Sequence, residues 1–364
     1  MPEMIRYTLN GVVREDISKE AEAILKEDIT ALEGALCAKT GASHCLAVPG
    51  VPLGLYIALR AAGVMMDEPV LCSGFAQEHL VQSVLLAGGK PLLVDINPNT
   101  YNIDPYLLEY IIGKCIRTKR PIPRVLVIAD LFGLPCNYNA IEEICYAHEI
   151  TLIVDAGESL GGSAQGIRAG TAGRFGVISL AKEPHNPQKG ECGAVLCHSA
   201  EDRELLQKML RQSRGGAYLD AVSGDSIRAG IALERLEEHW EEIRARQKSA
   251  GEYRDCFAGG LKIQQIPEEY ESSSSRFVVS LPSDADKAQV LARLAEKGIP
   301  CECFEVPGWE WEEDEWSPAL LMNARNAYER LIVIPMNPFL GGRVTADIAR
   351  SVIRLVRPSL FTNP

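Results

Sequence analysis

The sequence predicts an α/β protein with a large, mostly parallel-sheet domain and a smaller C-terminal α+β domain. Two observations lead to this prediction. Over residues 44–159, short apolar runs alternate with longer stretches whose apolar residues recur at helical spacing. In addition, 364 residues are more than one hydrophobic core usually supports. We therefore predict two domains, over residues 1–245 and 246–364.

The first half of the chain contains the elements of the predicted parallel sheet in order. Residues 20–40 carry apolar side chains at helical spacing, HCLAV at 44–48 resembles a strand, and a helix is expected from Gly50. Strands and helices then alternate through PVLCSG, HLVQSVLLAGG, KPLLVDI, PYLLEYIIGKC, RVLVIADLFG, YNAIEEICYAHE and TLIVDAGES. The strands are nearly continuous apolar runs, which is typical of parallel strands joined by right-handed crossovers and buried on both faces.

The second half predicts a linking helix and a smaller domain. A long stretch rich in Glu and Arg, Ile227 to Tyr253, is expected to join the two domains as a helix. Ser272 to Ser275 predict a loose turn before the strand RFVVSLP, and KAQVLARLAEKG predicts a helix. The acidic segment GWEWEEDEW at 308–316 is either a solvated loop with anchoring aromatics or a tryptophan-rich recognition surface.

Composition excludes several classes of function. A formal net charge of −12 argues against nucleic acid and anionic membrane as partners, because both are bound by clustered Lys and Arg. No apolar run approaches the ~20 residues that a membrane-spanning helix needs. The 11 cysteines follow no secretory leader and predict reduced thiols in the cytoplasm. Their spacing, as in Cys301 and Cys303, predicts no metal site.

The informative loops are those that follow the predicted strands. Ligands of parallel sheets bind beyond the carboxyl ends of the strands, so the loops after Val48, Ile128 and Val154 are the candidate site. Asp155 ends an apolar strand at this edge. Taken alone, a strand-end aspartate is either a helix cap or a ligand-binding carboxylate.

Several blocks of sequence resemble the DegT/DnrJ/StrS family of sugar aminotransferases, which depend on pyridoxal phosphate (PLP) and have the fold type I architecture. The blocks are ALRAAGV at 58–64, LLAGGKPLLVDINPNTYNIDP at 85–105, DLFGLPCNYNAI at 130–141, VDAGESLGG at 154–162, GECGAV at 190–195 and RLIVIPMNPFLGGRVT at 330–345. The resemblance implies a fold type I PLP-transferase-like fold, a keto-sugar pathway, and a homodimer whose sites are built across the subunit interface.

The resemblance also implies which residues would hold PLP. Asp155 matches the carboxylate that keeps the pyridine nitrogen protonated. Glu158 stands where the family has Gln, and an ionised carboxylate cannot donate to the ring hydroxyl. Gly50 and Val51 match the phosphate-binding turn without its hydroxyls, and Ser179 matches a serine that contacts the phosphate.

The lysine that binds PLP covalently in the family has no counterpart at the aligned position. That position is Pro184 or His185, depending on loop length. Lys182 could replace the lysine if the loop shifts, with Lys189 as a remoter candidate. His185 could instead act as the base of a PLP-dependent sugar 3-dehydratase, since imidazole moves protons near neutral pH. A histidine in a plain proline-flanked turn is the simpler alternative.

Two further family positions are altered. Phe75 is the candidate aromatic for stacking on the ring, with Gln77 or His79 nearer the aligned place. The Asn-Tyr-Arg-Met stretch that many members contribute from the neighbouring subunit aligns with residues 221–224, which are Ala-Val-Ser-Gly. Arg228 is a candidate substitute for the missing cation, although it is equally a surface helix arginine.

Three hypotheses follow. The altered positions favour a non-transaminating relative that binds a sugar-nucleotide or another metabolite, as a homodimer or as a heterodimer with an active paralogue. The alternatives are a working PLP enzyme, through Lys182 as an aminotransferase or His185 as a dehydratase, and a PLP-independent enzyme that uses Asp155, Glu158 and His185 as acid-base groups. PLP is the implied cofactor, but these substitutions predict that it is weakly bound or lost.

Overall fold

A computed structural model describes residues 6–8, 11–13, 29–180, 192–213, 230, 232–233, 236–305 and 321–357. The larger part is built on a seven-stranded sheet with the strand order β3-β11-β10-β7-β6-β4-β5. These strands are β3 His44–Val48, β4 Pro69–Ser73, β5 Lys90–Val94, β6 Val125–Ala129, β7 Thr151–Ala156, β10 Phe175–Ser179 and β11 Gly193–Cys197. Neighbours pair in parallel from β10 to β5, while β11 is antiparallel to both β10 and β3. The predicted mostly parallel sheet is confirmed.

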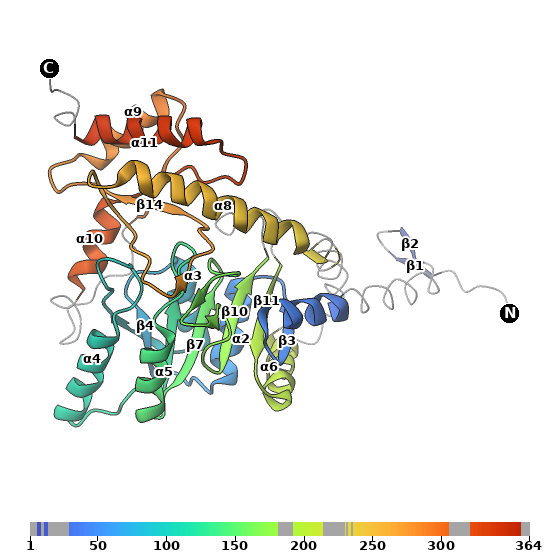
Figure 1. Cartoon of the computed structure of the whole chain (residues 1–364). Coiled ribbons are helices and arrows are strands. Elements are labelled where there is room, and N and C mark those ends of the chain that lie inside the picture. Colours follow the sequence, from blue (N-terminus) through green and yellow to red (C-terminus); the bar gives the residue numbers. More distant parts are fainter. Residues whose placement is uncertain are drawn as a thin grey trace, which may run out of the picture.

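Helices cover both faces of this sheet (Figure 1). They are residues 29–40, α2 Val51–Ala61, α3 Glu78–Ala87, α4 Pro105–Arg117, α5 Tyr138–Ala147 and α6 Ala200–Ser213. Adjacent strand residues point to opposite faces, so Val70 and Val127 pack with α2 and α3, whereas Leu71 and Leu126 pack with α4 and α5. The strands are therefore buried on both faces, which explains their continuous apolar sequence.

A second sheet of four strands forms the C-terminal part, in the order β12-β14-β16-β15. Its strands are β12 Lys262–Ile263, β14 Phe277–Ser280, β15 Glu302–Cys303 and β16 Leu331–Ile334, all antiparallel. The helices of this part are α9 Lys287–Glu296, α10 Met322–Arg330 and α11 Gly342–Val356. A separate core joins α9 and α11 to one face of this sheet. The predicted α+β arrangement is confirmed.

The long helix α8, Leu236–Phe257, runs between the two parts and appears gold in Figure 1. It ends later than the predicted helix over 227–253, whose first residues lie partly outside the described residues, and the predicted domain boundary at residues 245 and 246 falls inside it. A small sheet also links the parts, because β13 Tyr270–Glu271 pairs with β8 Ser163–Ala164. β8 pairs in turn with β9 Ile167–Arg168, forming a hairpin. The domain boundary itself stays a prediction.

The serine-rich segment before β14 differs from its prediction as a loose turn. Ser272, Ser273 and Ser274 are buried. The Ser273 backbone N–H donates to the Gly133 carbonyl at 2.9 Å, and the Ser273 hydroxyl donates to the Glu158 carbonyl at 3.0 Å. Serine hydroxyls can hydrogen-bond to buried backbone groups as well as to water in an exposed turn. This segment therefore connects the two domains through hydrogen bonds.

No helix among the described residues is long and apolar enough to cross a bilayer. They also contain no cluster of three or more His, Cys, Asp or Glu side chains arranged for a metal ion. All 11 cysteines lie in the described part, and none of them forms a disulfide. The remaining strands, β1 Arg6–Thr8 and β2 Gly11–Val13, form a hairpin near the N-terminus.

Candidate functional site

The carboxyl ends of the parallel strands meet at one edge of the large sheet. Asp155 near the end of β7 is in register with Ala129 at the end of β6. Ser179 at the end of β10 is in register with Gly193, which is in register with Val48 at the end of β3. The structure thus brings four predicted cofactor positions to one edge: Asp155, Glu158, Ser179 and the turn Gly50–Val51.

Asp155 is paired with a histidine from another element. Its carboxylate is 6% exposed, and Oδ2 lies 2.8 Å from Nε2 of His79 in the first turn of α3. The Gly157 backbone N–H donates to Oδ1 at 3.1 Å. The side chain of His79 is 22% exposed, so the imidazole lies between the buried carboxylate and solvent.

Glu158 is surrounded by donors from three segments. Gln77 Nε2 donates to Oε1, and the Phe132 backbone N–H donates to Oε2 at 2.8 Å. Arg276 Nε lies 3.0 Å from Oε1 in a buried ion pair, outside hydrogen-bonding alignment. Because Arg276 comes from the small domain, Glu158 joins the two domains. Its backbone carbonyl also accepts from Ser273.

A second buried carboxylate lies behind this edge. Asp130 accepts from the Tyr138 hydroxyl, from the Ser159 hydroxyl at 2.7 Å and from the Cys136 backbone N–H at 2.8 Å. Burial raises the pKa of Asp130 to about 6, although these donors oppose the shift. Sequence reasoning pointed to the loop after Ile128 without singling out Asp130. Its position directly after a buried strand was the available signal.

Phe75 lies in an aromatic cluster between the domains. It is 1% exposed, and its ring packs edge-on against Phe132, Phe304 and Tyr328, with centroid distances of 6.1, 5.2 and 4.5 Å. Phe304 and Tyr328 belong to the C-terminal part. This packing is that of a core residue, and ring stacking by Phe75 stays a prediction. Gln77 and His79, two and four residues later, are the side chains that contact the acidic pair.

The phosphate end of the predicted site has few donors. Gly50 caps α2 in an extended conformation with no side-chain cap, and Pro52 in the first turn has no N–H. Val51 has no hydroxyl. Ser179 is buried, with 7% of its surface exposed. Of the predicted phosphate-binding positions in the described residues, it is the one that carries a hydroxyl.

Several predicted residues lie outside the described residues. They are Lys182, His185 and the neighbouring Pro184 and Lys189, the stretch 221–224 with Arg228, and the segment 308–316. Within the described residues, the donor set suits PLP in part. Asp155 could hold a pyridine nitrogen and Ser179 could hold a phosphate oxygen, whereas Glu158 and the turn Gly50–Val51 lack the donors that the ring hydroxyl and phosphate need. The described residues would thus supply only part of what PLP needs.

The large, mostly parallel sheet with its small C-terminal partner defines a class of protein, the α/β proteins of the fold type I architecture. The sequence pattern of the DegT/DnrJ/EryC1/StrS aminotransferase family matches residues 12–353, and the chain belongs to this family. The family resemblance and the fold class predicted from sequence are both confirmed.

Known relatives agree with this assignment. The chain is 28% identical over 331 residues to the UDP-2-acetamido-2-deoxy-3-oxo-D-glucuronate aminotransferase of Pseudomonas aeruginosa, covering 89% of each protein. Its fold is similar to that of a DegT DnrJ EryC1 StrS aminotransferase from Brucella abortus, with a TM-score of 0.78, 22% identity and coverage of 94% and 97%. It is also similar to an E. coli GDP-4-keto-6-deoxy-D-mannose-3-dehydratase with bound hydrated PLP, with a TM-score of 0.73, 18% identity and coverage of 96% and 100%.

Proposed function

We propose that this chain is a diverged DegT-family protein of nucleotide-sugar or secondary-metabolite biosynthesis that does not transaminate. It keeps the family scaffold and binds a sugar-nucleotide or a related metabolite at the carboxyl edge of the large sheet. The P. aeruginosa relative acts, by its name, on a UDP-linked keto sugar, which supports this substrate class.

One observation carries the proposal: both carboxylates of the candidate site already have protein partners. Asp155 is paired with His79, and Glu158 with Gln77 and Arg276. A pyridine nitrogen would compete with an imidazole for the same Asp155 oxygen. A deprotonated ring oxygen would face the Glu158 carboxylate, which is ion-paired with Arg276, and two acceptors facing each other repel. Together with the missing aligned lysine, this pairing favours a binding role.

The test is a PLP titration of the purified full chain, followed by borohydride reduction and peptide mass spectrometry. The proposal expects no visible absorbance band, no label fixed on a lysine, and measurable binding of a UDP-linked sugar by calorimetry. PLP fixed on Lys182 would overturn it in favour of the aminotransferase. PLP that binds but cannot be fixed would overturn it in favour of the His185 dehydratase. Absence of sugar-nucleotide binding would overturn the binding role.

Restoring a lysine tests whether the aligned lysine is the one PLP contact that is missing or whether the ring and phosphate contacts are missing too. The variants His185→Lys and Pro184→Lys place an amine at the two aligned positions. Because the ring and phosphate contacts are altered as well, we expect neither variant to hold PLP after reduction. A stoichiometric label on either lysine would show that the rest of the PLP site is intact, contrary to the proposal.

A PLP-independent acid-base reaction is a second candidate, and the His79–Asp155 pair favours it. Nε2 of His79 faces the Asp155 carboxylate at 2.8 Å, and this contact fixes the orientation of the imidazole. Together the two side chains form an acid-base pair at the carboxyl edge. If turnover of a keto sugar-nucleotide is found, His79→Gln should abolish it, because an amide cannot take up or release a proton as imidazole does. Unchanged turnover would exclude His79 as the base.

We further propose that the protein is cytoplasmic and dimeric, as a homodimer or with an active paralogue. The family resemblance supports a dimer, and C2 dimers are the commonest assemblies. Light scattering after size-exclusion chromatography measures the mass directly. A monomer at micromolar concentration, with no paralogue recovered by co-expression, would contradict this proposal.

A further inference from the structure

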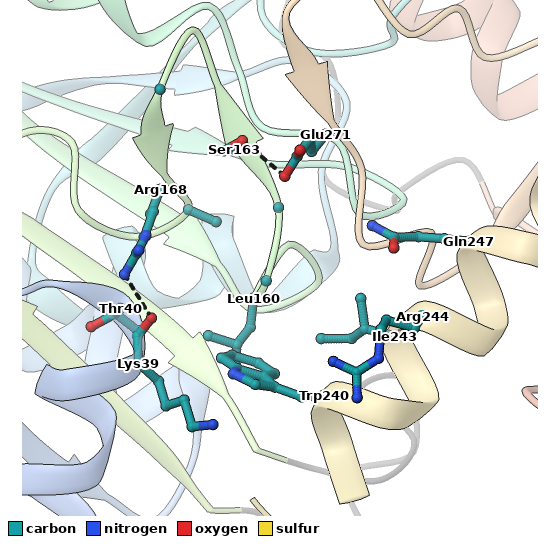
Figure 2. Close-up of a pocket in the computed structure, with 14 residues that line it drawn as sticks. Lys39, Thr40, Leu160, Ser163, Arg168, Trp240, Ile243, Arg244, Gln247 and Glu271 are labelled. Atoms are coloured by element: carbon teal, nitrogen blue, oxygen red, sulfur yellow. Dashed lines mark hydrogen bonds between the residues drawn. The ribbon is translucent and has the colours of Figure 1, made fainter. Parts of the chain in front are cut away.

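A pocket lies between three segments of the chain. It is bounded by the end of helix 29–40, by the loop and hairpin over 160–169, and by the first turns of α8 (Figure 2). It holds about 350 Å³, within the range of small-molecule sites. None of the residues assigned to the candidate site lines it.

Positive charge gathers in this pocket. Its lining includes Lys39, Arg168 and Arg244, and among the described lining residues Glu271 is the single acid. The chain as a whole carries a formal charge of −12, so the pocket reverses the sign of its surroundings. A concave site with net positive charge attracts an anion, and guanidinium groups suit phosphate oxygens.

The cations are positioned by the fold. Arg168 Nη1 donates to the Lys39 carbonyl at 3.0 Å, which holds the hairpin against the end of helix 29–40. Lys39 Nζ lies 5.9 Å from the centroid of a Trp240 ring, a cation-π distance. Figure 2 shows Lys39, Arg168 and Arg244 on three different segments, with the Trp240 and Leu160 side chains between Arg244 and the other two. An anion there would neutralise charges that come from distant parts of the sequence.

Another side of the pocket is apolar. Trp240, Leu160 and Ile243 line the same pocket, with Ser163 and Gln247 as nearby hydrogen-bonding groups. Gly161 has a φ of +87°, and a Cβ there would come within 2.6 Å of Ile243 Cδ1. This close approach keeps the loop against α8. A planar ring could pack against the indole while its phosphates reach the arginines.

We infer that this pocket binds a small nucleoside phosphate, with the base against Trp240 and the phosphates against Arg168, Arg244 and Lys39. An inorganic phosphate would use the cations but leave the Trp240 ring without a partner from the ligand. The site lies where helix 29–40 covers the face of the sheet, apart from Asp155 and Glu158, so this inference does not depend on the proposed function.

Calorimetry with ADP, UDP and pyrophosphate on the full chain tests the inference. We expect Arg168→Ala/Arg244→Ala to weaken ADP or UDP binding by about tenfold or more. Trp240→Ala should weaken the nucleotides by about tenfold, because base stacking is lost, while pyrophosphate binding stays unchanged. Arg117→Ala, an exposed arginine on α4, is the matched control and should have no effect.

Photolabelling with an azido-adenine nucleotide separates this pocket from the carboxyl edge. Label within residues 160–169 or 236–247 supports the inference, whereas label confined to residues 50–54 or 155–158 overturns it. Equal affinity for pyrophosphate and ADP would overturn the role of Trp240. Arg168→Lys keeps the charge at this position, and full binding by this variant would show that a loss in the double variant reflects charge and not misfolding.

Discussion

Asp155 and His79 pair with each other in the candidate site, so the buried carboxylate already has a partner within the protein. A buried carboxylate needs donors, and here an imidazole provides one where a bound ligand would otherwise do so. Glu158 likewise accepts a hydrogen bond from Gln77 and forms an ion pair with Arg276. The carboxyl edge is thus internally satisfied, which lowers the gain from binding a group that must displace these partners.

His79→Ala should lower the free energy of unfolding by about 1–3 kcal/mol, because Asp155 would stay buried with one donor fewer. His79→Gln keeps a donor of similar reach and should recover most of this loss. Urea unfolding monitored by circular dichroism measures both. Equal stability of the two variants would show that the contact with Asp155 contributes little.

The buried groups Asp130 and His239 should give opposite pH dependences of stability. Burial raises the pKa of Asp130 from 3.8 to about 6, so its contribution to stability falls as pH rises from about 4 to 6. Burial and nearby Arg246 lower the pKa of His239 from 6.5 to about 4, so its contribution rises with pH over the same window. Each change amounts to about 3 kcal/mol.

Single variants separate these two contributions. Asp130→Asn should leave the rising part from His239, so stability increases with pH between about 4 and 6. His239→Gln should leave the falling part from Asp130. Unfolding free energies at four pH values across this window provide the test. Parallel profiles for wild type and both variants would refute the assignment to these residues.

At the level of secondary structure, strand β10 lies in close backbone contact with the turn that precedes it. Gly176 in β10 lies directly against the turn at Gly170, which has a φ of +76°. A Cβ at Gly176 would come within 1.9 Å of the Gly170 carbonyl oxygen. Here glycine is needed for space, in the strand that carries Ser179.

Gly176→Ala should therefore destabilise the protein strongly, by about 3 kcal/mol or more, because backbone and not a flexible side chain must move. Gly251→Ala in α8 is the matched control. A Cβ there meets no atom within 4 Å, and alanine in a helix interior is favoured over glycine by about 0.5–1 kcal/mol. Thermal unfolding should move in opposite directions. A neutral Gly176→Ala would mean that the turn at Gly170 relaxes easily.

In the chain as a whole, the two domains are held by buried polar contacts as well as by aromatic packing. Arg276 and Glu158 form an ion pair with side chains that are 8% and 6% exposed. Asp95 of the large domain accepts from the backbone N–H groups of Asn323 and Ala324 at 2.9 and 2.7 Å. Such contacts couple the geometry of the carboxyl edge of the large sheet to the position of the small domain.

Glu158→Gln should cost about 3–5 kcal/mol, because it leaves the Arg276 guanidinium buried without its carboxylate. The double variant Glu158→Gln/Arg276→Met should lose less than the sum of the single variants. Asp347→Asn, which breaks the exposed pair with Arg350, serves as the control and should change stability by about 0.5 kcal/mol or less. Additive losses in the double variant would exclude coupling between the two residues.

Much of the fold was predictable because burial leaves a clear pattern. The runs at 45–48, 125–129 and 152–154 are apolar throughout, as strands covered on both faces must be, and each lies in a strand of the large sheet. β8, β9 and β13 were not predicted, since two-residue strands carry too little pattern. The Ser272–Ser274 segment was predicted as loose because serine composition does not reveal burial.

The sequence by itself determined the fold class, the family and the edge at which Asp155, Glu158, Ser179 and Gly50 would meet. Strand-end positions follow from the order of apolar runs. Only the tertiary structure decided the partners of the carboxylates. His79 lies 76 positions from Asp155, and Arg276 reaches Glu158 from the other domain. Which side chains meet depends on strand order and domain packing, and spacing along the chain does not encode either one.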